Sequence, residues 1–332
     1  MRNKGTKKNK KPQSSQRKFN KYSFKTLCPL WLIYNLVKCQ IFALLVLLIF
    51  AACKPRQETP QAEGAITDAL GRRYTQNKYP GRIVSLSPAI TEILFAIGAG
   101  EKVVGVTQYC DYPPEAKTRT QVGGFSGATV SMEQVRFLKP DLVILSADMH
   151  ARIVSLLDEL GIPSYAAEPR NFSQVYSTIE LMGEITGFQD GAEKIIDEMK
   201  EKIAMVESIV SGRERPGVFW ILNEDPLMTA GAETFVSEAI KLGGGRNIFE
   251  ELREQWPMVS PEQVLLRKPD WVFFGNDADP AALLKERWQL IPAVREGRVL
   301  IVDADTLYRY GPRLADAVVS LAKVLHPDAL PD

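Results

Sequence analysis

From residue 82 onward, short apolar runs alternate with stretches whose apolar residues recur at helical spacing. Runs of four or five apolar residues are typical of buried strands, and spacings of three and four residues are typical of helices. The expected strands cover residues 83–86, 103–106, 142–145, 218–222, 271–274 and 299–302, and helices are expected over, for example, 89–97, 153–160 and 314–325. This alternation predicts an α/β fold with mainly parallel sheets.

One amphipathic stretch, residues 191–210, has no strand beside it until residue 218. As a helix it would be about 30 Å long. Its central position predicts a single long rigid helix that joins two lobes, and the alternative is an ordinary surface helix of one sheet domain. The expected plan is a basic tail and signal peptide (1–52), a tether (53–64), an N-terminal lobe (65–187), the connecting helix (188–212) and a C-terminal lobe (213–332).

An internal repeat supports two lobes of related design. Residues 130–143 read VSMEQVRFLKPDLV and residues 259–272 read VSPEQVLLRKPDWV, identical at nine of fourteen positions and 129 residues apart. In each copy a serine, Ser131 or Ser260, is placed to cap a short helix, with a glutamine three residues on as its capping-box partner. A Lys-Pro pair then ends the helix before an apolar strand.

Both copies also carry a glutamate, Glu133 and Glu262, in the first turn of the expected helix. The helix dipole alone favours an acid there, so either glutamate taken singly has an ordinary explanation. Because the whole motif recurs once in each lobe, we interpret the two glutamates as a pair with a shared surface role.

The N-terminus has the features of an export signal. Residues 1–52 hold 11 Lys and Arg residues and no Asp or Glu. Residues 41–52 are apolar, too short to span a bilayer comfortably, and suit the core of a signal peptide. They end in small residues before Cys53, which resembles the lipobox of bacterial lipoproteins, so we expect a lipidated Cys53 and an extracytoplasmic protein, periplasmic or at the cell surface. The alternative is an uncleaved membrane anchor over residues 27–52. A separate hypothesis is that translation starts at Val37, which would give a compact signal peptide.

Composition excludes several classes of function. Beyond residue 52 the chain has 30 basic and 40 acidic residues, which argues against nucleic-acid binding. The only histidines are His150 and His326, so a metal site built from several histidines is excluded. His150 follows an expected strand; we expect it in solvent at a helix start, and the alternative is that it faces a cleft. Cys110 is the one cysteine beyond Cys53, which rules out a disulfide within the globular part.

Motifs of nucleophilic and nucleotide-dependent enzymes are also missing. The chain has no G-x-S-x-G, no Walker A loop and no G-x-G-x-x-G between a strand and a helix. We therefore expect a binding protein with no catalytic residues, no metal site and no cofactor of its own. A surface enzyme that acts on a cofactor is the alternative from another class.

Four segments carry a family resemblance: RIVSLSPAITEILFAIGAGEKVVGV, QYCDYPPEAKTRTQVGGFSG, the two VSxEQV motifs, and YGPRLADAVVSLAKVLHP. Together, over residues 65–327, they resemble the substrate-binding proteins of bacterial ABC importers, in the subgroup that takes up cobalamin, ferric siderophores and haem, and most closely its cobalamin binders. The resemblance implies a small-molecule ligand held between two lobes, and an ABC permease dimer with its ATPase subunits as partner. We expect the protein to be a monomer tied to the membrane by its lipid anchor.

The resemblance also implies site residues. Tyr109, Phe125 and Trp256 match aromatic positions of the ligand cleft, and Asp305 and Arg309 match polar ones. The three aromatic residues lie beside Pro and Gly in expected loops, where binding residues are common; the alternatives are core packing for the aromatics and a surface ion pair for Asp305 and Arg309. Glu133 and Glu262 match glutamates that pair with permease arginines.

The ligand itself stays open between related metal chelates. Ser146 and Leu222 stand where cobalamin binders have tryptophan and phenylalanine. A ferric siderophore would use arginines and tyrosines, for which Tyr308, Arg309, Tyr310 and Arg313 are the candidates. A haem would need a tyrosine as axial ligand, a role that Tyr109 could fill.

Overall fold

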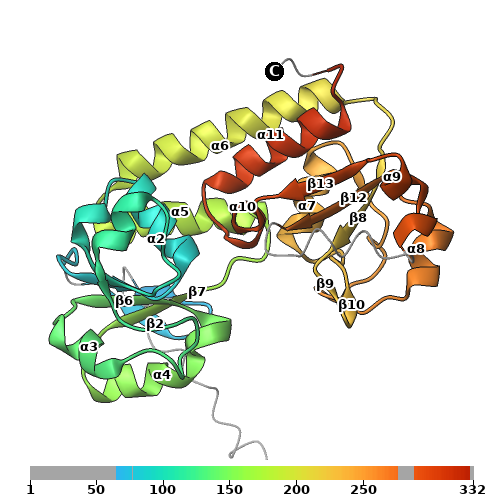
Figure 1. Cartoon of the computed structure of the whole chain (residues 1–332). Coiled ribbons are helices and arrows are strands. Elements are labelled where there is room, and N and C mark those ends of the chain that lie inside the picture. Colours follow the sequence, from blue (N-terminus) through green and yellow to red (C-terminus); the bar gives the residue numbers. More distant parts are fainter. Residues whose placement is uncertain (1–64, 77, 276–287, 330–332) are drawn as a thin grey trace, which may run out of the picture. The chain divides into compact units, whose positions relative to one another are not determined.

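The computed structural model describes residues 65–76, 78–275 and 288–329. The predicted signal peptide, Cys53 and the tether over residues 53–64 lie outside these ranges. The α/β fold with two parallel sheets is confirmed (Figure 1). Within the described ranges, no helix combines the length and apolarity needed to cross a bilayer.

The first sheet and its helices form what we call the N-terminal lobe. Its five strands are all parallel in the order β5-β4-β3-β6-β7, and β3, β6 and β7 are buried throughout, as expected for strands covered on both faces. The elements are β1 (Ala65–Thr67), β2 (Arg73–Thr75), β3 (Ile83–Ser85), α2 (Pro88–Ala96), η1 (Gly100–Lys102), β4 (Val103–Val106), η2 (Pro114–Thr118), β5 (Thr120–Gln121), α3 (Met132–Phe137), β6 (Leu142–Ser146), α4 (Ala147–Glu159) and β7 (Ser164–Ala167).

The second sheet and its helices form the C-terminal lobe. Its four strands are parallel in the order β11-β8-β12-β13. The elements are β8 (Gly217–Ile221), β9 (Asn223–Glu224), β10 (Leu227–Met228), α7 (Phe235–Leu242), β11 (Arg246–Asn247), α8 (Pro261–Arg267), β12 (Trp271–Gly275), η4 (Trp288–Leu290), α9 (Pro292–Arg295), β13 (Val299–Val302), α10 (Ala304–Tyr308) and α11 (Arg313–Leu325). All six strands that the sequence predicts are present, with small differences at their ends.

Two helices, rather than one, lead from the first sheet to the second. The chain passes from β7 through α5 (Phe172–Thr186) and then α6 (Gln189–Val210) before β8. Gly187 separates the two helices with a left-handed φ of 78°. The long helix predicted over residues 188–212 is present as the 22-residue α6. A single connecting helix is not confirmed, because α5 also belongs to the connection. Both α5 and α11 pack against α6.

The two copies of the repeat fold alike, as α3 and α8. The Ser131 and Ser260 hydroxyls each accept a hydrogen bond from the backbone N–H three residues on, both at 3.3 Å. The reciprocal bond that completes a capping box forms only in the second copy, from the Ser260 N–H to the Gln263 side chain. Lys139 and Lys268 both adopt left-handed backbone, with φ of 47° and 48°, since the proline after each lysine disfavours continuing the helix.

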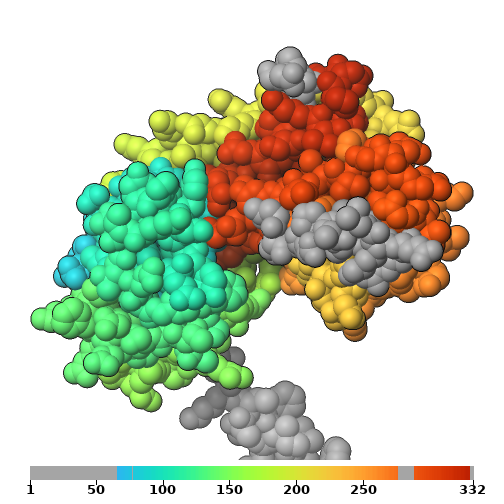
Figure 2. Space-filling model, viewed as in Figure 1, coloured from blue at the N-terminus to red at the C-terminus, as the bar shows by residue number. Residues whose placement is uncertain are grey.

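One apolar core runs through both lobes. Its buried residues include Ile93 of α2, Met199 of α6 and Leu321 of α11. Figure 2 shows the red C-terminal segment lying directly against the blue-green N-terminal lobe. Smaller apolar clusters fill the far side of each sheet. This shared core sets the position of the loops that follow the strands.

Candidate ligand-binding site

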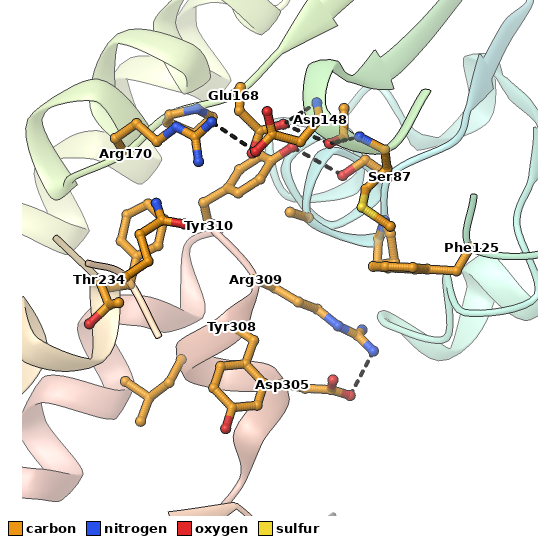
Figure 3. Close-up of a pocket in the computed structure, with 18 of the residues that line it drawn as sticks. Ser87, Phe125, Asp148, Glu168, Arg170, Thr234, Asp305, Tyr308, Arg309 and Tyr310 are labelled. Carbon is orange, nitrogen blue, oxygen red and sulfur yellow. Dashed lines mark hydrogen bonds and ion pairs between the residues drawn. The ribbon is translucent and has the colours of Figure 1, made fainter. Parts of the chain in front are cut away.

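A cavity of about 540 Å³ lies where loops from the two lobes meet (Figure 3). Most of its N-terminal wall comes from segments that follow β3, β4, β6 and β7, so it sits at the carboxyl ends of parallel strands, where ligands bind in open α/β sheets. The lining residues are 86–89, 109, 125, 146, 148–150 and 168–170 from the N-terminal lobe, and 222, 233–236, 255–256, 305 and 307–310 from the C-terminal lobe.

All five residues predicted to contact ligand line this cavity. Tyr109 and Phe125 form an edge-to-face pair on the N-terminal wall, with ring centroids 5.7 Å apart. They are 46% and 49% exposed, so neither is a core aromatic. On the facing wall Trp256 meets Tyr308 edge-to-face at 5.9 Å. The two lobes thus bring together aromatic residues that are far apart in the sequence.

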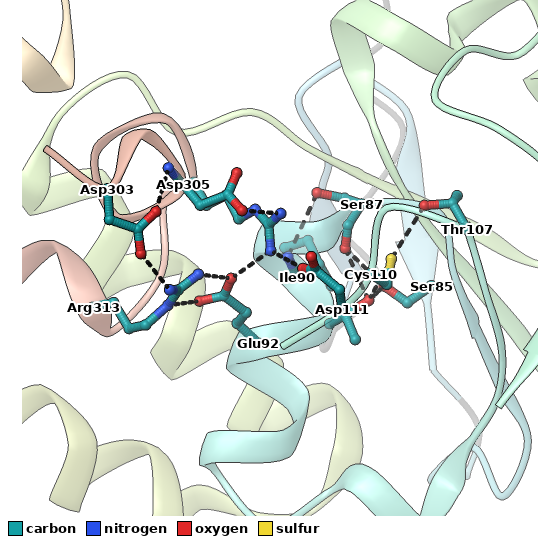
Figure 4. Close-up of polar contacts among 12 residues, drawn as sticks. Ser85, Ser87, Ile90, Glu92, Thr107, Cys110, Asp111, Asp303, Asp305 and Arg313 are labelled. Carbon is teal, nitrogen blue, oxygen red and sulfur yellow. Dashed lines mark hydrogen bonds and ion pairs between the residues drawn. The ribbon is translucent and has the colours of Figure 1, made fainter. Parts of the chain in front are cut away.

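Arg309 is held in a network of carboxylates. Its guanidinium contacts Glu92 at 3.1 Å, Asp111 at 2.7 Å and Asp305 at 2.6 Å. Glu92 and Asp111 belong to the N-terminal lobe, so this network joins the lobes beside the cavity (Figure 4). The ion pair considered as an alternative for Asp305 and Arg309 is therefore present, but as part of a half-buried bridge rather than an isolated surface pair.

Arg313 extends the same network. Its Nε and Nη2 atoms donate to the two oxygens of Glu92 at 2.8 and 2.6 Å.

Burial would raise the pKa of Asp111, but the hydrogen bond and charge of Arg309 outweigh it and hold that pKa below its usual value. Burial acts to lower the pKa of Arg309, yet its carboxylate neighbours raise it further. Asp111 and Arg309 therefore stay charged across the physiological range.

The cavity wall carries more negative than positive charge. Four carboxylates line it, from Asp148, Glu168, Glu233 and Asp305, against the guanidiniums of Arg170 and Arg309. Both guanidiniums are paired, because Arg170 lies 2.8 Å from Asp148 and Arg309 is in the network above. The wall is thus suited to a neutral or cationic ligand.

The positions that lack the family's aromatic residues have other partners. Ser146 caps α4 and donates a hydrogen bond of 2.6 Å to Glu168. Leu222 adds an aliphatic surface after β8. Of the siderophore candidates, Tyr308, Arg309 and Tyr310 line the cavity, whereas Arg313 is not among its lining residues.

His150 faces the cavity, which was the alternative to the solvated position expected for it. We expected a solvated side chain at a helix start, but His150 is 1% exposed and lines the cavity from the first turn of α4. Neither ring nitrogen makes a hydrogen bond of ordinary geometry to a residue that the structure describes. Burial lowers the pKa of His150, although the backbone of Ser146 and Phe125 opposes this shift.

Several wall residues were missed by sequence reasoning. Glu168 and Arg170 follow β7, whose sequence SYAA gives little strand signal. Glu233 and Thr234 precede α7, where Thr234 is the N-cap. Because this strand is hard to recognise in the sequence, the polar residues that follow it were missed as well. Among the described residues, no three or more His, Cys, Asp or Glu side chains form a group that could hold a metal ion.

Glu133 and Glu262 lie away from the cavity. Both are exposed, on α3 of one lobe and α8 of the other. Hydrogen bonds from the Ser260 hydroxyl and from the backbone lower the pKa of Glu262. The two glutamates are therefore surface features, placed once per lobe.

Comparison with known proteins fixes the family. The sequence profile of the periplasmic binding protein family matches residues 83–306. The chain belongs to this family. It is 34% identical over 284 residues to an uncharacterized ABC transporter substrate-binding lipoprotein, YvrC, of Bacillus subtilis, covering 83% of this chain and 89% of the relative.

Solved structures of two relatives share the fold. The periplasmic vitamin B12-binding protein BtuF of Vibrio cholerae matches with a TM-score of 0.65 and 31% identity, over 74% of this chain and 96% of that one. The periplasmic haem-binding protein RhuT of Roseiflexus matches with a TM-score of 0.65 and 28% identity, over 75% and 99%. The chain is thus a periplasmic binding protein, and its relatives include an ABC transporter substrate-binding lipoprotein, a vitamin B12-binding protein and a haem-binding protein.

Proposed function

We propose that this periplasmic binding protein captures cobalamin in the cavity between its lobes and delivers it to an ABC permease. The observation that carries the proposal is the pair of aromatic contacts on facing walls, Tyr109 with Phe125 and Trp256 with Tyr308. A corrin ring is large, flat and partly apolar, and aromatic faces bind such a surface at low cost in side-chain entropy.

The charge of the wall supports cobalamin over its anionic alternatives. The lining has two more carboxylates than guanidiniums, and both guanidiniums are already paired. A haem carries two carboxylates of its own, and a ferric catecholate is an anion. Each would therefore meet like charge, because both guanidiniums among the described lining residues are already paired. Cobalamin has uncharged amide side chains around its ring, and the charge on cobalt balances the single phosphodiester of its nucleotide loop, so cyanocobalamin is neutral overall.

Haem is the second candidate, because Tyr109 could serve as its axial ligand. The Tyr109 side chain lines the cavity and is 46% exposed, and a tyrosine oxygen is a known axial ligand of haem iron. A ferric siderophore bound by Tyr308, Arg309 and Tyr310 is the remaining alternative within this class.

The experiment that tests the choice is a competition. The purified full chain in detergent is mixed with equimolar cyanocobalamin, haemin and ferric enterobactin, and the protein fraction from gel filtration is examined by its visible spectrum. Cobalamin absorption in that fraction supports the proposal. A haem or ferric-catecholate spectrum in its place contradicts it.

The remaining parts of the account are proposals of the same kind. The protein is a monomeric receptor rather than an enzyme, has no cofactor of its own, and is held outside the cytoplasm by lipid on Cys53. Its partner is a permease dimer with its ATPase subunits. Glu133 and Glu262 each pair with an arginine of that dimer, because carboxylate and guanidinium form charge-assisted, bidentate hydrogen bonds.

A further inference from the structure

Two large apolar side chains stand almost fully in solvent, one on each lobe. Phe137 is 78% exposed and Leu266 is 80% exposed, the two highest values among the large apolar residues that the structure describes. They are 129 residues apart, which is the offset of the internal repeat. The same position of the two copies therefore presents a bare apolar side chain in both lobes.

Each of these side chains shares a helix face with a glutamate. Phe137 follows Glu133 by four residues on α3, and Leu266 follows Glu262 by four residues on α8. Residues four apart on a helix are surface neighbours. The opposite face of each helix is anchored by a valine at a matching position, Val135 and Val264, both fully buried. Each lobe thus displays a carboxylate and an apolar group side by side on a fixed helix.

The surroundings of both side chains widen the apolar area. Beside Phe137 lies a groove of about 960 Å³ whose apolar wall includes Leu156 and Leu160 of α4, which are 39% and 36% exposed. Its charged lining residues are Glu133, Arg82, Arg136 and Lys139. In the C-terminal lobe, Met258 stands just before the second repeat copy and is 71% exposed. Single exposed apolar residues are ordinary, but a patch that recurs with an acid on each lobe points to binding.

We propose that Phe137 and Leu266 are the apolar anchors by which the two lobes dock on the permease dimer. This inference rests on the proposed function and deepens it. A partner with twofold symmetry offers the same surface twice, and this protein presents a similar patch once on each lobe. The partner surface that fits each patch is an apolar pocket beside a basic residue. The pocket would take the exposed phenyl or leucyl group, and the basic residue would pair with the neighbouring glutamate.

The two kinds of contact differ in their response to salt. Ion pairs at an interface rim are screened by salt and act mainly on encounter and orientation. Burial of an apolar side chain is not screened, and one large side chain contributes enough to change affinity about tenfold. Apolar anchoring therefore predicts docking that weakens with salt but persists at high salt.

The test measures binding of the full chain to the same organism's permease dimer and ATPase subunits in lipid nanodiscs, at about 50 mM and about 500 mM NaCl. The double variant Phe137→Ser with Leu266→Ser should bind at least about tenfold more weakly at both salt concentrations. Glu133→Gln with Glu262→Gln should instead lose affinity mainly at low salt. Leu70→Ser with Met205→Ser, exposed apolar residues on other elements, is the matched control and should bind as the wild type does.

The outcomes separate this inference from the proposal beneath it. If the wild type and the Phe137/Leu266 variant bind the permease equally well, Phe137 and Leu266 are not docking anchors, and the proposed delivery to a permease stands. If sedimentation shows that the same variant abolishes self-association instead, the patches join copies of this chain and the inference is overturned. If the wild type binds no permease, the delivery function fails and this inference fails with it.

Discussion

Arg309, the C-cap residue of α10, and Glu92 of α2 join the two lobes directly, with Nη1 of the guanidinium 3.1 Å from Oε1 of the carboxylate. The Glu92 side chain is only 2% exposed, and Arg313 occupies both of its oxygens as well. The Ser87 and Tyr310 hydroxyls make a second contact between the lobes at 3.2 Å. The walls of the cavity are therefore set by buried polar contacts and not by the connecting helices alone.

Loss of the Glu92 charge should destabilise the protein strongly. Glu92→Gln leaves two half-buried guanidiniums without their shared anion, and breaking a buried ion pair from one side costs about 3–5 kcal/mol in the free energy of unfolding. Urea unfolding followed by circular dichroism measures it. Glu101→Gln is the control, because Glu101 pairs with Arg119 while 95% exposed and should change stability by less than about 1 kcal/mol. Equal effects of the two changes would show that the bridge between the lobes adds nothing.

Trp256 should be a main contributor to ligand binding. Trp256→Ala removes an aromatic surface from the cavity wall and should weaken binding by about 1–3 kcal/mol, as for a large aromatic contact. Tyr79→Ala, at an exposed aromatic residue outside the cavity, should leave the Kd unchanged. A Trp256→Ala protein that binds with wild-type affinity would place the ligand elsewhere.

The buried imidazole of His150 should make stability depend on pH. Burial lowers its pKa below 6.5 in the folded chain, so the unfolded chain takes up a proton at a higher pH than the folded chain. The stability contributed by the neutral ring is complete above about pH 6.5 and is lost as pH falls through the folded value. Between about pH 7.5 and about pH 5.5, the free energy of unfolding of the wild type should therefore fall more steeply than that of His150→Leu. Identical slopes would mean that His150 does not titrate in this range.

Much of the architecture could be predicted because its signals are local. The runs around Ile83, Leu142 and Val272 are short and apolar, and each became a buried strand. The repeat predicted two similar capped helices, which are α3 and α8. The strand β7 escaped notice because it is short and contains only one residue that favours strands, Tyr165, beside Ser and Ala.

Parts of the site that depend on distant partners could not be predicted in this way. Glu92 lies in the apolar sequence PAITEILFA, and its partners Arg309 and Arg313 are more than 200 residues away. His150 was expected in solvent because a polar residue near a helix start is usually exposed, whereas the loop that carries Phe125 and Gly127 packs over α4 and covers it. In both cases the contact belongs to the tertiary structure and leaves no local pattern.

Lipidation should depend on Cys53. Stable anchoring requires more than one acyl chain, and the residues before Cys53 resemble the site where a lipoprotein precursor is modified and cleaved. Cys53→Ser should therefore leave unprocessed precursor or release the protein from the membrane fraction. Mass spectrometry of the wild type that shows an intact N-terminus and no acyl mass would favour a membrane-spanning anchor.

Titration calorimetry of the full chain with cyanocobalamin tests the central claim most directly. The cavity lined by Tyr109, Phe125 and Trp256 predicts saturable binding of one cobalamin per chain, with haemin and ferric catecholate binding more weakly. No heat with cobalamin, together with clear binding of a ferric chelate, would contradict the ligand assignment.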